Sequence, residues 1–101
     1  MTVIVLTADG KKITLETVSG PSSYTTGGFP VTFRDLTNVQ HILSARANTG
    51  VIAEGYIPAA SGNLASVRVY WQTGASGTPM TEVASGANLS SITFTVVGLG
   101  Y

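Results

Sequence analysis

The sequence predicts an all-β protein: a small antiparallel β-sandwich or barrel of six to seven strands, in a single domain spanning residues 1–101. Short segments rich in β-branched and aromatic residues alternate with a period of two, as half-buried strands do. Clusters of Gly, Pro, Asn, Asp and Ser separate these segments, and no stretch has a helical apolar period of useful length. A chain of 101 residues also fits one hydrophobic core, since chains divide into several domains only beyond roughly 250 residues.

The first two predicted strands form a hairpin. Residues 2–8 are β-branched nearly throughout and end at an Asp-Gly dipeptide, which readily adopts the positive φ angles of a tight turn. The return strand, residues 12–19, alternates in a way that predicts Ile13 and Leu15 facing the core. If Ile13 and Leu15 face the core, the alternation places Glu16 on the solvent side.

Five further strands are predicted in the rest of the chain, at residues 39–47, 51–57, 65–73, 82–84 and 91–99. The first two of these are expected to pair as a second hairpin across an Asn-Thr-Gly turn. In residues 39–47 the period of two places His41 and Leu43 on the apolar face. Residues 65–73 have the clearest alternation, with Ala65, Val67, Val69 and Trp71 on one face, and Phe94 and Val96 share a face in the last strand.

The longest interruption is a loop over residues 20–36. Its prolines and glycines remove backbone donors and permit left-handed angles, so no regular strand is expected over residues 20–30. Tyr24 and Phe29 are large apolar groups among small residues, and they either pin the loop to its own core or contact a neighbour; we favour the first. Residues 32–36 are expected to form a short helical turn capped by the initial threonine.

Charge is unusually sparse. Charged side chains make up 10% of the chain, five basic and five acidic, whereas typical soluble domains carry about 25%. A neutral surface relies on Ser, Thr, Asn and Gln for solubility and favours association over repulsion. We therefore expect either a chain that functions in an assembly or an extracellular domain with a hydroxyl-rich surface.

Neither nucleic acid nor a membrane is an expected partner. The basic residues are scattered, whereas phosphate binding requires clustered Lys and Arg. No apolar run approaches the roughly 20 residues of a membrane span. Residues 1–8 lack the basic start and long apolar stretch of a signal peptide, so we expect a soluble chain that is not exported by one.

No catalytic, cofactor-binding or metal-ligating constellation is recognisable. The chain has no cysteine, and His41 is its only histidine, which we interpret as a core or interface residue. The five carboxylates lie in five different segments, which gives no support for a catalytic pair. Gly27-Gly28 is followed by Phe-Pro and lacks the Lys and Ser or Thr of a phosphate loop. We expect a protein that is not an enzyme, with no cofactor and no metal.

A carbohydrate-binding β-sandwich remains an alternative. Tyr56 and Tyr70 would form a stacking platform if their strands paired and both rings were exposed. Cross-strand packing of the two rings is the structural alternative, and we favour it.

Two blocks, SSYTTGGFPVTFRDL at residues 22–36 and EVASGANLSSITFTVVG at residues 82–98, resemble small virion structural proteins of tailed bacteriophages. Those proteins have a Ser-Tyr-x-Thr-Gly-Gly-x-Pro segment with a short Asp-Leu turn, and later a Glu-Val-x-x-Gly-x-x-Leu-Ser segment before a final strand. Both blocks occur here in the same order and cover about a third of the chain. The chain departs from the pattern at Phe29, where a polar residue is usual, and at Thr37-Asn38, where a glycine-containing turn is usual.

The resemblance implies a non-enzymatic part of a phage particle, made in the host cytoplasm. Its expected place is the capsid exterior, as a head decoration (cement) protein that stabilises the lattice of the major capsid protein, commonly as a homotrimer. The candidate partner-binding residues are Tyr24, Phe29, Phe33 and Tyr101, whose truncation is expected to loosen attachment more than it unfolds the subunit. A tail, baseplate or fibre component is the alternative, with residues 74–79 as a receptor-binding loop.

Overall fold

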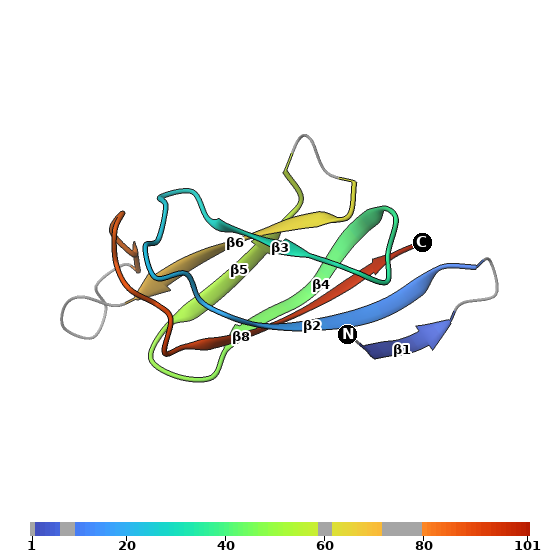
Figure 1. Ribbon diagram of the computed structural model, residues 1–101, viewed down its shortest axis with the longest axis horizontal. Helices are drawn as coiled ribbons and strands as arrows, with labels where there is room; N and C mark the ends of the chain where they lie inside the picture. Colours follow the sequence, from blue (N-terminus) through green and yellow to red (C-terminus); the bar gives the residue numbers. More distant parts are fainter. Residues whose placement is uncertain (1, 7–9, 59–61, 72–79) are drawn as a thin grey trace.

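The protein is a two-layer β-sandwich. The computed structural model describes residues 2–6, 10–58, 62–71 and 80–101, which form eight strands and no helix (Figure 1). Sheet I contains, in spatial order, β1 (Thr2–Leu6), β2 (Lys12–Ser19), β8 (Thr93–Gly100) and β4 (Val39–Ala47). Sheet II contains β3 (Phe29–Thr32), β6 (Leu64–Trp71) and β5 (Ile52–Tyr56), and the two-residue β7 (Thr81–Glu82) also pairs with β6. All pairings are antiparallel, so the predicted fold class is confirmed.

The hydrophobic core lies between the two sheets. Its buried members are Tyr24, Phe29, Val31, Phe33, Leu36, Val39, Ala65, Val67, Val69, Val83, Leu89, Phe94 and Val96. The predicted inward faces of β6 and β8 are confirmed, although Trp71 is partly exposed at the end of its strand. The rings of Phe29 and Phe94 meet edge to face at 5.1 Å between centroids and connect the sheets. Such a pair adds about 0.5–1.5 kcal/mol to the burial of the rings.

The β1–β2 hairpin is confirmed, but the predicted phase of β2 is wrong. Thr14 and Glu16 face the interior, 0% and 2% exposed, while Ile13 and Leu15 lie on the outer face of sheet I and are half-buried. Glu16 pairs with Val96 of β8, and the Val96 side chain lies in the core. Because residues paired across two strands share a face of the sheet, Glu16 also points inward. The neighbouring strand therefore sets which face of β2 is buried.

The buried carboxylate of Glu16 is satisfied by the turn that follows β3. It accepts hydrogen bonds from the Arg34 backbone N–H (3.0 Å) and from Arg34 Nη2 (3.4 Å). Lys12 Nζ donates to the Asp35 carbonyl (3.1 Å) on the same turn. Because a buried carboxylate without partners is costly, this turn makes the inward position of Glu16 tolerable.

Strand β4 also departs from the expected phase. Its pairing with β8 shifts register twice, between Val39 and His41 and again between Ile42 and Ser44. Each irregularity adds a residue on one strand and reverses the alternation. As a result Ile42 packs against the core, while Leu43 and His41, which was predicted to be a core or interface residue, are exposed on the outer face of sheet I.

The predicted second hairpin is wrong. Strand β4 pairs with β8 in sheet I, whereas β5 pairs with β6 in sheet II. Residues 48–51 are a corner that carries the chain from one layer to the other. The turn residues were identified correctly, but a turn joins strands in a sandwich whether or not they pair.

The predicted loop over residues 20–36 contains strand β3, which the sequence did not suggest. Pro30 is tolerated because β3 is an edge strand that pairs only with β6. The predicted helical turn over residues 32–36 is absent; instead, the Leu36 N–H donates to the Phe33 carbonyl (3.2 Å) and closes a β-turn. Asp9 and the predicted loop at residues 74–79 lie outside the described residues.

Candidate functional site

The two segments that carry the resemblance lie against each other at one end of the sandwich (Figure 1). We call residues 20–28 and 83–92 the paired loops. Backbone hydrogen bonds of 2.7–2.8 Å join them: Gly20 N–H to Ile92 O, Leu89 N–H to Pro21 O, Tyr24 N–H to Ala87 O and Gly86 N–H to Tyr24 O. The paired loops therefore form one hydrogen-bonded unit although neither is a strand.

Gly20 permits this close approach. A Cβ atom at Gly20 would lie 2.3 Å from the Leu89 carbonyl oxygen and 2.8 Å from the Phe94 ring. Contacts that short do not occur in folded proteins, so any larger residue would push the loops apart. Gly20, the first residue of the predicted loop, is therefore a point of close contact between the two loops.

Tyr24 connects the paired loops to sheet II. Along one edge of β6, β3 pairs with residues 64–67 and β7 with residues 70–71, which leaves Val69 between them. The Tyr24 hydroxyl accepts the Val69 N–H (3.1 Å) and donates to Glu82 Oε2 (2.7 Å). Burial, together with the hydrogen bond to Glu82, raises the pKa of Tyr24 to about 12. The phenol thus stays protonated and completes the edge of β6.

Glu82 holds the other end of this connection. Its Oε2 accepts hydrogen bonds from the Gly27 N–H (2.6 Å) and from Tyr24. Both donors favour the carboxylate form, so the backbone hydrogen bond from Gly27 and the phenol lower the pKa of Glu82 below its usual range. Gly27 has a φ of 103°, a left-handed conformation that glycine adopts without strain.

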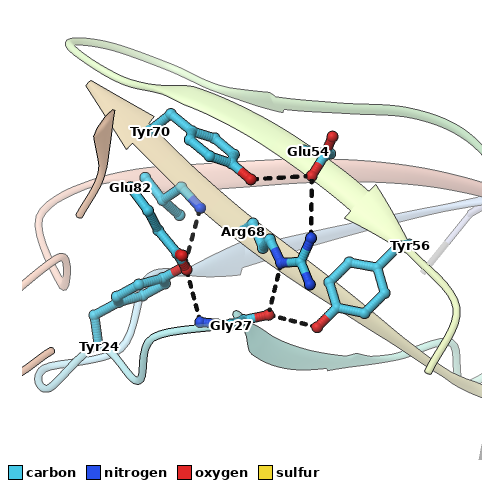
Figure 2. A network of polar contacts seen from close by, with 8 residues as sticks. Tyr24, Gly27, Glu54, Tyr56, Arg68, Tyr70 and Glu82 are labelled. Carbon is cyan, nitrogen blue, oxygen red and sulfur yellow. Dashed lines mark hydrogen bonds and ion pairs between the residues drawn. The ribbon is translucent and has the colours of Figure 1, made fainter. Parts of the chain in front are cut away.

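Both backbone polar groups of Gly27 are hydrogen-bonded, its N–H to Glu82 and its C=O to side chains of sheet II (Figure 2). Its carbonyl accepts hydrogen bonds from the Tyr56 hydroxyl and from Arg68 Nε (3.3 Å). The Arg68 guanidinium lies 4.5 Å from the centroid of the Tyr56 ring, and its Nη1 is 3.8 Å from Glu54 Oε1. The outer face of sheet II therefore carries a connected polar network that fixes the loop at Gly27.

The network also includes Tyr70. Its hydroxyl donates to Glu54 Oε1 (3.3 Å), the same oxygen that lies near the Arg68 guanidinium. Tyr56 and Tyr70 are both half-buried, and Arg68 covers one face of the Tyr56 ring. This arrangement disfavours the alternative of an open stacking platform for sugars, because a platform needs free ring faces.

The groups of this network bond to one another, and their geometry is that of a structural brace. Among the described residues no group of three or more His, Cys, Asp or Glu side chains is placed to hold a metal ion. A shallow hollow of about 250 Å³ lies between β4 and β5, lined by Ala45, Arg46, Ala47, Val51, Ile52 and Ala53. These mostly aliphatic side chains offer no nucleophile or general base.

The outward surface of the paired loops is uncharged and rich in hydroxyl groups. Its exposed polar residues are Ser22, Ser23, Thr25, Thr26, Ser85, Asn88, Ser90 and Ser91. Several are held in place: Ser85 Oγ accepts from the Thr26 N–H (3.2 Å), and Asn88 Oδ1 accepts from Ser90 Oγ (2.6 Å). The surface is thus both neutral and preorganised.

The four predicted contact residues are not together. Tyr24, Phe29 and Phe33 are buried in the core of their own chain, with exposed fractions of 1%, 6% and 0%, which agrees with the interpretation favoured for the first two. Tyr101 is 49% exposed and lies beyond the other end of β8. In the isolated chain, the three buried rings have almost no surface to offer a partner.

Glu82, Glu54 and Arg68 were not selected from the sequence as site residues. The Gly27 N–H and Glu82 are 55 residues apart, and no local pattern pairs them. The two resemblance blocks were the one available signal, since each contributes one partner of this bond.

No family model matches the chain, and neither a curated protein nor a solved structure is significantly similar to it. The described residues contain no helix long and apolar enough to span a membrane.

Proposed function

We propose that this chain is a non-enzymatic structural protein of a tailed-phage virion, a decoration (cement) protein that binds the outer surface of the major capsid lattice and stabilises it. The observation that carries the proposal is the packing of residues 20–28 against residues 83–92. These segments hold about half of the two blocks that resemble phage virion proteins, and backbone hydrogen bonds join them into a single unit. If the two blocks serve one binding function in the virion proteins that they resemble, they are expected to lie together in the folded chain.

The chemistry of the paired loops suits permanent attachment to protein. Their aromatic ring and carboxylate partner are used internally, in the bonds of Tyr24 to Glu82 and Gly27 to Glu82. Loops ordered before binding lose little conformational entropy on docking. Their neutral hydroxyl surface matches the zero net charge of the chain, which disfavours a partner selected by charge.

The surface serines and threonines of the paired loops replace the three buried rings as our candidate capsid contacts. Ser23 on the first loop and Ser85 on the second are exposed representatives of this surface. Tyr101 remains a candidate for a contact with a sister subunit at the other end of the molecule. A homotrimer on the capsid exterior is the assembly that the resemblance favours.

The copy number of the chain in purified virions tests the proposal. Quantitative mass spectrometry with labelled peptides would compare it with the major capsid protein. Near-equal copies support a capsid-wide decoration lattice, and a small fraction moves the chain to the tail, baseplate or a fibre. Absence from the virion overturns the proposal.

A binding experiment then tests the contact surface. Ser23→Arg places a bulky charge on the paired loops, whereas Thr37→Arg places the same charge on the exposed turn at the opposite end. We expect Ser23→Arg to weaken binding to capsids stripped of this chain by at least tenfold, with Thr37→Arg unchanged. Equal binding by both variants would remove the paired loops as the capsid contact.

A further inference from the structure

The outer face of sheet I is unexpectedly apolar. Its centre is formed by two cross-strand pairs between β2 and β8, Ile13 with Leu99 and Leu15 with Val97. All four side chains are half-buried, and Leu43 of β4 adds a fifth apolar group that is 53% exposed. We call these five residues the apolar face. It was missed from the sequence because Ile13 and Leu15 were assigned to the core.

No described strand covers the apolar face. Every described strand belongs to one of the two sheets, and sheet II packs on the opposite side of sheet I. An antiparallel sheet with one side in the core normally turns polar residues to solvent on the other. Here the solvent side carries two adjacent aliphatic cross-strand pairs together with the exposed Leu43, and such a group favours an interaction surface.

The composition of the face is that of a protein interface. Interfaces have a core depleted in charge and a polar rim. The rim here includes Thr17 and Thr95, which pair across β2 and β8, and Ser44, which pairs with Val97, with Arg46 at one end and His41 at the other. Among the described residues the apolar face itself contains no charged side chain.

The dimensions of the face fit a contact with a second copy. The apolar face is the centre of the outer side of sheet I. Strands β2 and β8 have eight residues each, so this whole outer side, polar rim included, is roughly 27 Å long and, over four strands, roughly 19 Å wide. Two such outer sides in full contact would bury on the order of 1,000 Å² in total, the lower limit for a specific protein interface. The area predicts a weak but specific pair.

Charge also permits self-association. The net charge of the chain is zero, so two copies do not repel at long range. Arg46 pairs with Thr95 near the start of β8, and His41 pairs with Leu99 near its end. When two faces meet about a two-fold axis perpendicular to the strands, the two Arg46 side chains lie at opposite ends of the contact.

We propose that two copies of this chain pair through the apolar face of sheet I, with Leu15 and Val97 near the two-fold axis. The pair is isologous, because the same surface serves both copies. It is a different contact from the trimer that the resemblance implies. It also involves only this chain, so its test is separate from that of capsid binding.

Sedimentation equilibrium of the purified full chain, up to millimolar concentration, measures the pairing. We expect a monomer–dimer equilibrium that Leu43→Lys and Leu15→Lys each weaken at least tenfold. The matched control is Ile52→Lys, because Ile52 is a 60% exposed aliphatic residue on sheet II; its dimerisation should equal that of the wild type. Circular dichroism checks that each variant is folded, and Leu43→Lys decides the result if Leu15→Lys unfolds.

Disulfide formation gives a second measurement, since the chain has no native cysteine. Under mild oxidation Val97→Cys should form a covalent dimer much faster than Ile52→Cys. A wild type that stays monomeric at all concentrations would overturn the proposal, as would an oligomer that survives Leu43→Lys unchanged or is weakened equally by Ile52→Lys. Any of these results would leave the proposed attachment to the capsid untouched.

Discussion

The backbone N–H of Gly27 lies 2.6 Å from the carboxylate of Glu82, although 55 residues separate them in the chain. This bond links the first of the paired loops to strand β7, and the same oxygen accepts the Tyr24 hydroxyl. The Glu82 carboxylate therefore holds the loop at Gly27 and the Tyr24 ring in place. Through Tyr24 it also keeps the Val69 N–H hydrogen-bonded at the edge of β6. Its loss or protonation should affect all three together.

Tyr24→Phe should lower the free energy of unfolding by about 1–3 kcal/mol, because the buried Val69 N–H loses its acceptor. Urea unfolding followed by fluorescence measures the change. Tyr101→Phe removes a hydroxyl from an exposed ring and is the control, with an expected change within about 0.5 kcal/mol. Equal stability of the two variants would mean that the Tyr24 bonds contribute nothing net.

Stability should fall in strong alkali. The folded-state pKa of Tyr24, about 12, is above the ordinary value of 10.0, so its contribution is complete below pH 10 and is lost as the pH rises toward 12. An ultraviolet absorbance titration of the four tyrosines should show one phenol that ionises last. That step should disappear in Tyr24→Phe; its persistence would assign it to another tyrosine.

Acid should weaken the contact of the first loop with β7. The pKa of Glu82 is lowered by its Gly27 and Tyr24 donors, so the stability it contributes is present above the ordinary pKa of Glu and is lost as the pH falls through the lower folded value. The melting temperature of Glu82→Gln should be below that of the wild type at neutral pH, and the gap should close in acid. A gap independent of pH would exclude ionised Glu82 as its cause.

Phe33→Ala should destabilise the subunit itself by about 3–5 kcal/mol, because the ring is fully buried in the core. This reverses the expectation that its truncation would mainly loosen attachment to a partner. Tyr101→Ala is the comparison and should change the melting temperature little. A small effect of Phe33→Ala on the free subunit would restore the contact interpretation.

Gly98→Ala should cost about 1–3 kcal/mol through overpacking, since the added methyl would lie 2.9 Å from the Phe33 ring. Phe33→Leu should relieve part of that cost, so the double variant should be less destabilised than the sum of the single changes. Simple additivity in denaturant unfolding would mean that the two positions do not compete for space.

Local patterns were enough to predict the fold class and most strand positions. The alternation in residues 65–73 placed Ala65, Val67 and Val69 in the core, and Phe94 and Val96 followed in the same way. These strands were clear because one face is consistently more apolar than the other. The β1–β2 hairpin was also predictable, because few residues separate its strands.

The same patterns failed in β2 and β4, where the neighbouring strand decides which face is buried. Ile13 and Leu15 alternate with Thr14 and Glu16, and the apolar set lies outside. Alternation says only that two faces differ; which one is buried follows from the register with β8 and from the donors that Arg34 brings to Glu16. In β4, two register shifts reversed a phase that sequence spacing alone could not reveal.

The sequence by itself therefore determined that this is a neutral all-β chain of the sandwich or barrel type with two separate loop blocks, residues 22–36 and 82–98, because strand period, turn chemistry and charge are local or compositional properties. Only the tertiary structure decided that those blocks meet through Tyr24 and Glu82, and that sheet I has an apolar outer face. The physical reason is distance along the chain. Contacts between residues 58 positions apart depend on how whole strands pair, which no short segment encodes.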